Sequence, residues 1–279
     1  MSLSVFCLVL LAAASHASWN TIVKQGADKP LSTVLVATSV GLLGAVLLPF
    51  LPSPAQASWP YIAISVALQI VYFVLLARAY HLADMSQTYP LMRGAAPIVV
   101  ALVGALWLGE VLPLPAWLGI GGIAAGILSL LAGTPKGADR RGFATALTNA
   151  LVIAGYTLID GMGVRLSGAP LAYAAWLFVL TGLPLLGWAA VTRGPALRDY
   201  AARHWRLGLI GGLGSLVSYG VVLWAMTQAP VALVAALRET SILFGALLSW
   251  RLLGERTGAK RVLSIGMIAL GAVALRASR

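Results

Sequence analysis

Residues 89–110 read YPLMRGAAPIVVALVGALWLGE and place one arginine, Arg93, near the head of a long apolar run that ends in Gly-Glu. The same pattern returns in RETSILFGALLSWRLLGE, which begins at Arg238 and ends at Glu255. In both stretches 17 positions separate the arginine from the glutamate, and the two arginines are 145 residues apart. Such self-similarity in an apolar chain indicates a duplicated membrane protein. An arginine within a spanning helix costs at least about 2.5–3.5 kcal/mol, so this pair is the first candidate for a functional site.

The composition is that of a membrane protein. Of the 279 residues, 60% are hydrophobic and only 10% are charged, whereas soluble domains carry roughly 25% charged residues. The net charge of +11 comes from basic residues scattered over the loops. This is typical of positive-inside topology rather than of a nucleic-acid surface. We therefore expect an all-α integral membrane protein whose partners are the lipid bilayer and a small molecule, with no nucleic acid.

Several classes of chemistry are not indicated. The single cysteine, Cys7, excludes an internal disulfide. The sequence shows no His/Cys ligand cluster and no Walker or Rossmann motif, so we expect no metal, no cofactor and no ATP hydrolysis. The eight acidic residues are mostly dispersed, which disfavours an integral membrane transferase or hydrolase. The prediction is that the protein is not an enzyme.

The apolar runs predict ten transmembrane helices, since a span needs about 20 apolar residues. A polar linker at 134–142 divides them into a first five-helix repeat, 1–133, and a second, 143–279. Five is an odd number, so the second repeat enters the membrane inverted, with a central cavity between the two. The predicted helices are 5–24, 31–50, 60–80, 86–108, 114–132, 143–164, 170–191, 206–227, 230–253 and 260–275.

The loop charges predict the orientation. Loops after the odd-numbered helices carry fourteen of the Lys and Arg residues, and the opposite side carries three. The positive-inside rule then places both termini outside the cytoplasm.

Three segments carry a resemblance to a known family. HASWNTIVK at 16–24, the stretch 89–110, and APVALVAALRETSILFGALLSWRLLGER at 229–256 resemble the EamA-like transporters of the drug/metabolite transporter superfamily. The resemblance extends over the whole chain. It implies a basket-like bundle with a central cavity that exports amino acids, other metabolites or drugs from the bacterial inner membrane. Family members are often described with both termini inside, in contrast to the orientation that the loop charges of this chain predict.

Arg93 is the leading candidate for substrate binding, because a guanidinium can hold a carboxylate through two parallel hydrogen bonds. The alternative is that it caps backbone carbonyls near Pro90 and Pro97, where the hydrogen-bond ladder of the helix is interrupted. Tyr89, one turn earlier, is a weaker candidate for the same site.

Arg238 and Glu239 are adjacent, so in one continuous helix their side chains point about 100° apart and are not expected to pair. Asp160 is expected at a similar depth, and an Arg238–Asp160 bridge, fixed or gating, would offset much of the burial cost. Glu239 then has no expected partner. It is a candidate proton carrier or a candidate group for binding a substrate ammonium. The alternative is that it reaches water and has no such role.

The other candidates are a histidine and a set of polar and aromatic residues. His16 lies mid-helix and is a proton shuttle or, alternatively, a neutral histidine hydrogen-bonded between helices. Aromatic residues line a cavity and stack on a substrate, or serve packing. The members of this set, at equivalent places in the first and sixth helices or in the eighth, are Trp19, Asn20, Tyr156, Thr157 and Tyr219.

Two repeated features are assigned to architecture. Glu110 and Glu255 each end a helix just after a glycine, and Arg251 stands four residues before Glu255, where the two can pair. The glycine pairs Gly122/Gly126 and Gly208/Gly212 allow close backbone approach, in a homodimer or within a monomer, and we favour internal packing.

Together these features predict a secondary transporter that exports small metabolites, amino acids above all, by alternating access. Transport is either coupled to protons through His16, Asp160 and Glu239 or merely facilitated. The alternative is a multidrug exporter for cationic compounds, which would favour acids and aromatics over intramembrane arginines.

Overall fold

The structure is a computed structural model that describes residues 1–24, 28–133, 140–253 and 258–278. Every regular element in these ranges is helical, as predicted. The α-helices are α1 (Leu3–Lys24), α2 (Lys29–Leu47), α3 (Trp59–Leu82), α4 (Met85–Trp107), α5 (Leu114–Ser129), α6 (Arg140–Ser167), α7 (Pro170–Met226), α8 (Val231–Arg238), α9 (Ser241–Leu253) and α10 (Ala259–Ala277). Short 3-10 turns lie at Leu48–Phe50, Gln56–Ser58 and Leu130–Gly133.

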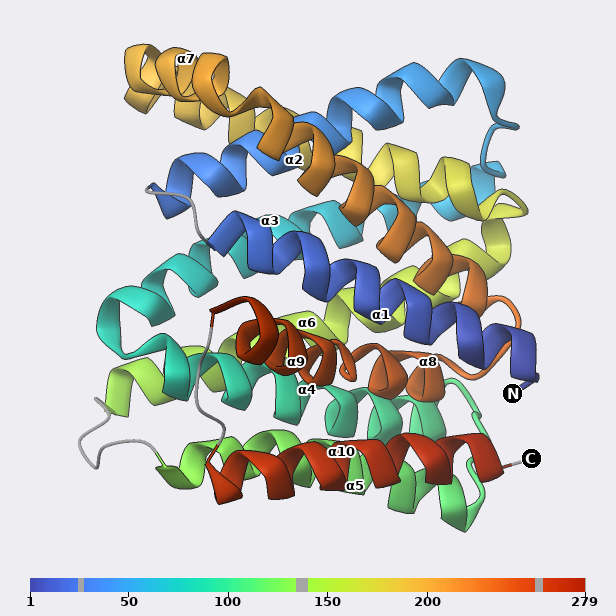
Figure 1. Ribbon diagram of the computed structural model, residues 1–279. Coiled ribbons are helices and arrows are strands. Elements are labelled where there is room, and N and C mark those ends of the chain that lie inside the picture. Colours follow the sequence, from blue (N-terminus) through green and yellow to red (C-terminus); the bar gives the residue numbers. More distant parts are fainter. Residues whose placement is uncertain (25–27, 134–139, 254–257, 279) are drawn as a thin grey trace.

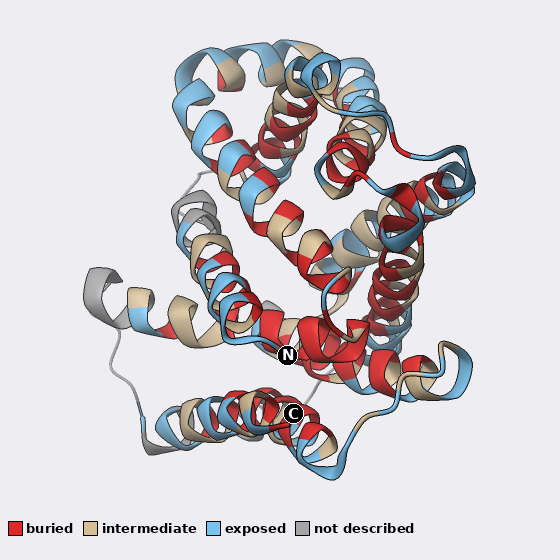
Figure 2. Ribbon diagram, turned by 90° about the vertical axis from the view of Figure 1, so that its right-hand side faces the viewer, coloured by how far each residue is buried: buried red, intermediate tan, exposed pale blue. Residues whose placement is uncertain are grey.

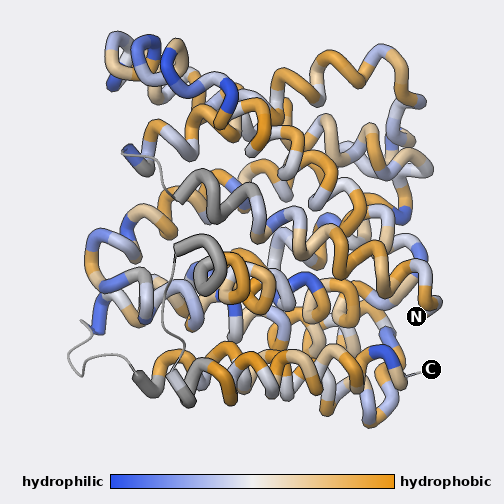
Figure 3. Tube along the Cα trace, viewed as in Figure 1, coloured by the Kyte–Doolittle hydropathy of each residue, from blue (hydrophilic) through white to orange (hydrophobic). Residues whose placement is uncertain are grey.

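The helices have the length and composition of membrane spans. Within the described residues, six helical segments are long and apolar enough to cross a bilayer. Three further apolar helices are shorter, at Leu3–Ser18, Leu114–Ser129 and Val262–Ala277. Large apolar side chains such as Leu106 and Val111 point outward. Figure 3 shows apolar residues along the outer helices and hydrophilic ones gathered at helix ends and at the turn of α7. An apolar exterior of this kind is that of an integral membrane protein.

The seventh and eighth predicted helices are present as the two arms of α7, and the residues between them are helical rather than an extended loop. α7 runs from Pro170 to Met226, with non-helical backbone at Arg193 and His204. Figure 1 shows α7 running out to one end of the molecule and folding back on itself. The chain reverses at the two kinks and through the helical residues between them.

The ninth predicted helix, 230–253, is broken in two, which corrects the prediction of one continuous span. α8 ends at Arg238 and α9 begins at Ser241. Around Glu239 and Thr240 the backbone N–H groups bond three residues back instead of four, to Ala236 and Leu237 at 3.1 Å each. The tighter turn interrupts the α-helical ladder. Each residue of α8 is buried, so the break lies inside the protein.

Helices from the two halves of the chain pair throughout the bundle. α5 packs on α10 and α2 on α7, and these pairs lie at opposite ends in Figure 1. Between them, α3 and α4 pack on α6, while α1 packs on α7, α8 and α9. Figure 2 shows buried residues on the faces where these helices meet and exposed residues on the outer faces.

Glycines set the closest of these contacts. A Cβ built on Gly126 would lie 2.7 Å from Ile268 Cγ1 and 3.0 Å from the backbone oxygen of Ser264 in α10. On α7, Gly208 and Gly212 face α2 in the same way, with Ser39 as a shared neighbour. The prediction that these glycines serve packing within the monomer is confirmed.

Candidate functional site

Buried polar residues gather where α8 meets α4, α6 and α7. α4 supplies Arg93, α6 supplies Asp160, and the end of α8 supplies Arg238 and Glu239. α4, α6 and α7 each pack on α8, the most fully buried helix of the set. Charges from helices far apart in the sequence therefore meet inside the protein.

Arg93, Glu239 and Arg238 form one charged cluster, called the Arg–Glu–Arg cluster below. Arg93 Nε lies 2.7 Å from Glu239 Oε2, and Arg238 Nη2 lies 3.5 Å from Glu239 Oε1. The Glu239 side chain is only 1% exposed, and the two arginine side chains are 12% and 10% exposed. The expectation that adjacent Arg238 and Glu239 do not pair is wrong, because Glu239 lies in the break and not within the helix that ends at Arg238. Glu239 is likewise not left over, since Arg93 binds it.

The break places each of these two charges at a favourable helix end. Arg238 is the last residue of α8, where the backbone carbonyls make the terminus partly negative. Glu239 lies just before α9, where the free backbone N–H groups make the terminus partly positive. These interactions partly compensate the burial of the charges.

The Arg–Glu–Arg cluster retains donors that nothing in the described residues accepts. Arg93 Nη2 and Arg238 Nε are buried without a hydrogen-bond partner. The 2.7 Å contact between Arg93 and Glu239 is a contact of charges whose angles do not make an aligned hydrogen bond. Two guanidiniums share one carboxylate, so the contacting residues carry one excess positive charge. The cluster is therefore suited to accept a second anion.

Asp160 has a separate environment. Its carboxylate accepts hydrogen bonds from Tyr219, at 2.5 Å, and from Tyr173, at 3.2 Å, both on α7. Asp160 is completely buried. No bridge to Arg238 forms in the described structure, which corrects that prediction. The hydroxyl groups of Ser65 and of the two tyrosines satisfy the carboxylate instead, and Arg238 acts on it only through space.

Aromatic rings surround the charged groups. The Tyr89 ring centroid lies 6.0 Å from Arg93 Cζ, at the outer limit of a cation–π contact. Tyr156 packs edge-to-face on Tyr72 at 6.0 Å, and Tyr219 packs similarly on Phe178 at 5.9 Å. Tyr156 and its neighbour Thr157 are buried. The structure thus brings Tyr89, Tyr156 and Tyr219 near the charged groups, and their predicted role in binding a substrate stays a prediction.

Several of the residues around the charged region were not predicted. Tyr72 and Tyr173 are aromatic residues with a polar hydroxyl in apolar helices. This pattern is visible in the sequence and could have marked them as candidates. Asn149 is fully buried and donates to Met92 Sδ at 3.0 Å, while its Oδ1 has no partner in the described residues. A lone amide in an apolar run is a comparable signal.

Other predicted residues lie elsewhere or outside the described part. His16 is half-buried on α1. The side chains of Trp19 and Asn20 lie outside the described residues, as do those of Arg251 and Glu255. For these four residues the predicted roles stay predictions.

Glu110 has the architectural role predicted for it. Gly109, with a φ of 65°, turns the chain after α4. The carboxylate of Glu110 then accepts the backbone N–H groups of Val231 and Ala232, at 2.6 and 3.2 Å, and so caps α8. Arg165 contacts the same carboxylate at 3.2 Å. No sequence pattern indicated Arg165 as the partner of Glu110.

Comparison with known proteins agrees with this arrangement. The sequence model of the EamA-like transporter family matches residues 3–132 and again residues 140–277. One solved crystal structure of a protein superposes with a TM-score of 0.75 at 18% identity, over 97% of this chain and 94% of its own. This likeness shows a shared fold. Curated proteins gave no match.

Proposed function

Because the chain belongs to the EamA-like transporter family, we propose that it carries small metabolites with a carboxylate group across the bacterial inner membrane. Amino acids are the favoured class. The observation that carries the proposal is the Arg–Glu–Arg cluster, with its excess positive charge and its free donors on Arg93 and Arg238. A substrate carboxylate supplies the missing anion and accepts from both guanidiniums.

The position of the cluster supports the same conclusion. In membrane transporters, substrate sites are typically built at discontinuous helices, where free helix ends face the ligand. The break between α8 and α9 is such a discontinuity, and Arg238 and Glu239 stand at it. On α4, which packs on α8, Arg93 stands between Pro90 and Pro97. Both helices thus carry a local irregularity beside a charge.

We propose alternating access as the mechanism, by rocking of two inverted five-helix repeats, 1–133 and 143–279, that contribute ten spans around a central cavity. The two separate ranges matched by the family model support this division. So does the reciprocal packing of the halves. The fourth helix of the first half, α4, packs on α6, the first helix of the second half, while α1 packs on α8 and α9. We further propose that the direction of transport is export.

The proposal is tested with three probes that share one side chain: a free amino acid, its carboxamide and the corresponding amine. A ligand that binds only the folded protein raises its apparent stability, by about 2.7 kcal/mol at a concentration 100 times the Kd. The free amino acid is expected to raise the thermal unfolding temperature of the purified protein. The carboxamide and the amine, which lack the carboxylate, are expected to leave it unchanged.

Arg93→Lys is the informative variant, with Arg165→Lys as the matched control. Lysine keeps the charge next to Glu239 but loses the planar fork, so the apparent affinity for the amino acid should fall by about tenfold or more. The control makes the same change in the other Arg–Glu contact and should keep the affinity. Stabilisation by cationic drugs alone, unaffected by Arg93→Lys, would favour the multidrug exporter and make Arg93 structural.

Coupling to protons is a separate part of the proposal. Asp160 and Glu239 are the buried acids of the site, and His16 lies half-buried on α1. Transport into proteoliposomes is measured with and without a pH gradient. If collapse of the gradient leaves the rate unchanged, coupling is discarded and the protein is a facilitator.

A further inference from the structure

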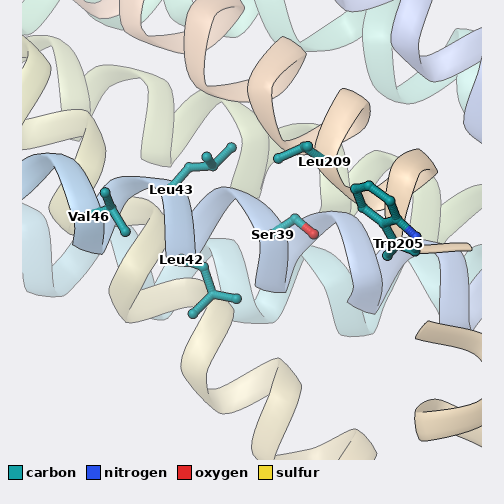
Figure 4. Close-up of a pocket in the computed structure, with 6 residues that line it drawn as sticks. All are labelled: Ser39, Leu42, Leu43, Val46, Trp205 and Leu209. Atoms are coloured by element: carbon teal, nitrogen blue, oxygen red, sulfur yellow. The ribbon is translucent and has the colours of Figure 1, made fainter. Parts of the chain in front are cut away.

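A groove lies on the outer surface between α2 and α7, with a volume of about 250 Å³. Four α2 residues, Ser39, Leu42, Leu43 and Val46, form one wall, and Trp205 and Leu209 of α7 form the other. Figure 4 shows the α2 residues in line along the helix, with Trp205 at the Ser39 end and Val46 at the far end. The lining is almost entirely apolar. We call it the α2–α7 groove.

The α2–α7 groove faces outward. Leu42 is 63% exposed, Val46 66% and Trp205 55%. In a membrane protein such residues face lipid, so the groove opens toward the acyl chains of the bilayer. The distance from Ser39 to Val46 along the helix is about 10 Å at 1.5 Å per residue, long enough to hold part of an acyl chain.

The shape of the groove is fixed by backbone packing. Gly208 and Gly212 of α7 press against Ser39, where an added Cβ would come within 2.7 and 2.9 Å of its side chain. The two helices therefore cannot close further, and Trp205 and Leu209 stand beside this contact. A groove formed in this way exists before a ligand arrives.

The Trp205 end of the groove carries positive charge. Arg198, Arg203 and Arg206 are exposed on the segment around the second kink of α7. None of the three forms an ion pair with any described residue, whereas Arg193 on the same segment binds Asp28. Arg206 Cζ lies 5.4 Å from the Trp205 ring centroid, so a guanidinium stands directly beside the mouth of the groove.

We infer that the α2–α7 groove is a binding site for an anionic phospholipid of the surrounding membrane. An acyl chain lies in the apolar groove, and the phosphate of the headgroup contacts Arg206 and Arg203. Tryptophan is the side chain that marks the membrane–water interface, and Trp205 lies where the acyl chain meets the headgroup. The arginines lie in the connection between the seventh and eighth predicted helices, which the charge distribution places on the cytoplasmic side, the side of the leaflet that carries anionic lipid. This inference does not depend on the transported substrate.

Lipid retention by the full-length protein tests the inference. Purified protein is equilibrated with phosphatidylglycerol or phosphatidylcholine of identical acyl chains, and the bound lipid is counted by native mass spectrometry. The test variants are Arg203→Gln/Arg206→Gln, which removes the headgroup contacts, and Val46→Trp, which fills the far end of the groove. The matched control, Arg78→Gln/Arg140→Gln, removes two exposed arginines from α3 and α6. Thermal unfolding checks that each variant is folded.

The native protein is expected to retain phosphatidylglycerol in preference to phosphatidylcholine by about tenfold or more. Arg203 and Arg206 each add to the attraction of the anionic headgroup. Arg203→Gln/Arg206→Gln should abolish the preference, and the control should keep it. Val46→Trp should lower the retention of both lipids. A preference that survives Arg203→Gln/Arg206→Gln overturns the inference. Full displacement of the lipid by soluble glycerol phosphate also overturns it, because the groove would then add nothing to headgroup binding.

Discussion

Two contacts in the described structure pair an arginine with a glutamate from distant parts of the chain, and they differ in what else those residues bind. In the first, Arg165 contacts Glu110 and also donates to the backbone oxygens of Met226 and Ala229, at 2.8 and 3.0 Å. Glu110 in turn caps the start of α8. This contact, called the α7–α8 clamp below, uses its charges to hold the connection between two helices.

The Arg–Glu–Arg cluster contains the same residue types, but its charged groups lack a full set of partners. Its guanidiniums keep buried donors without partners, and its single carboxylate is shared by two cations. A charged group whose partners include backbone groups serves the architecture, whereas a buried one that is left short of partners is suited to a ligand. Buried donors without partners therefore mark a candidate binding residue better than residue type or repetition in the sequence does.

The largest effect is expected for Glu239→Gln. The substitution leaves the Arg93 and Arg238 guanidiniums buried without an anion, a change that costs about 3–5 kcal/mol in buried pairs. The thermal unfolding temperature of the purified protein should fall sharply and recover on addition of a carboxylate ligand. Glu110→Gln, the matched change in the α7–α8 clamp, should show no such recovery. Equal recovery in both variants would remove the distinction between the two contacts.

Arg165→Ala tests the clamp itself. The backbone oxygens of Met226 and Ala229 and the Glu110 carboxylate each lose a partner, so we expect a loss of about 2–3 kcal/mol in stability. The apparent affinity for the ligand should stay within error, because no donor of the Arg–Glu–Arg cluster changes. Isothermal ligand titration of the folded variant measures this. A large loss of affinity would mean that the clamp belongs to the binding site.

Tyr219→Phe tests whether Asp160 has a structural role, as the α7–α8 clamp does, or a role in transport. The substitution removes the 2.5 Å hydrogen bond to Asp160 but leaves the one from Tyr173. We expect a loss of about 1–2 kcal/mol from chemical denaturation. A transport rate that falls much more than the stability would assign Asp160 to the transport cycle.

The smallest effect is expected at a third, more exposed pair, Arg193–Asp28, at 2.8 Å. The backbone N–H of Leu31 lowers the pKa of Asp28, partial burial opposes the shift, and Arg193 lowers the pKa further. Asp28 therefore stabilises the fold above the ordinary pKa of 3.8, and this contribution is lost as the pH falls through the lower folded-state pKa. Asp28→Asn should cost less than about 1 kcal/mol near neutrality.

The measurement for this pair is the stability difference between the native protein and Asp28→Asn as a function of pH. The difference should shrink as the solution is acidified. A difference that grows on acidification would contradict the direction assigned to the pKa.

Sequence reasoning succeeded where the signal is local. Apolar runs predict most of the helices, and the glycine before Glu110 predicts the turn that gives this residue its architectural role. It did not predict which side chains pair with one another across helices. Arg93 was singled out from the sequence and lies in the buried charged cluster, but its pairing with Glu239 was not predicted. That pairing joins α4 to α8, and no spacing along the chain encodes a contact between residues 146 positions apart.

The other failure has a specific cause. The separation of about 100° between Arg238 and Glu239 is valid only for a continuous helix. No glycine or proline marks the break at Glu239 and Thr240, so the pattern reads as one helix. The consecutive polar residues Arg238, Glu239 and Thr240 in an apolar run were the available sign. Buried groups of this kind need partners, and the backbone breaks where tertiary contacts supply them.

The glycine contact between α5 and α10 also limits how this chain can vary. A Cβ on Gly119 would lie 2.7 Å from Leu275 Cδ2 and 2.8 Å from the backbone oxygen of Gly271, and one on Gly271 would lie 2.8 Å from the backbone oxygen of Gly119. Neither glycine can be replaced on its own, because a Cβ on either residue would clash with the backbone of the other. In a saturation library selected for folded protein, both positions should be depleted of every other amino acid. Double replacements should be no more tolerated than single ones. By contrast Gly121, which has nothing within 4 Å of its added Cβ, should accept many residues.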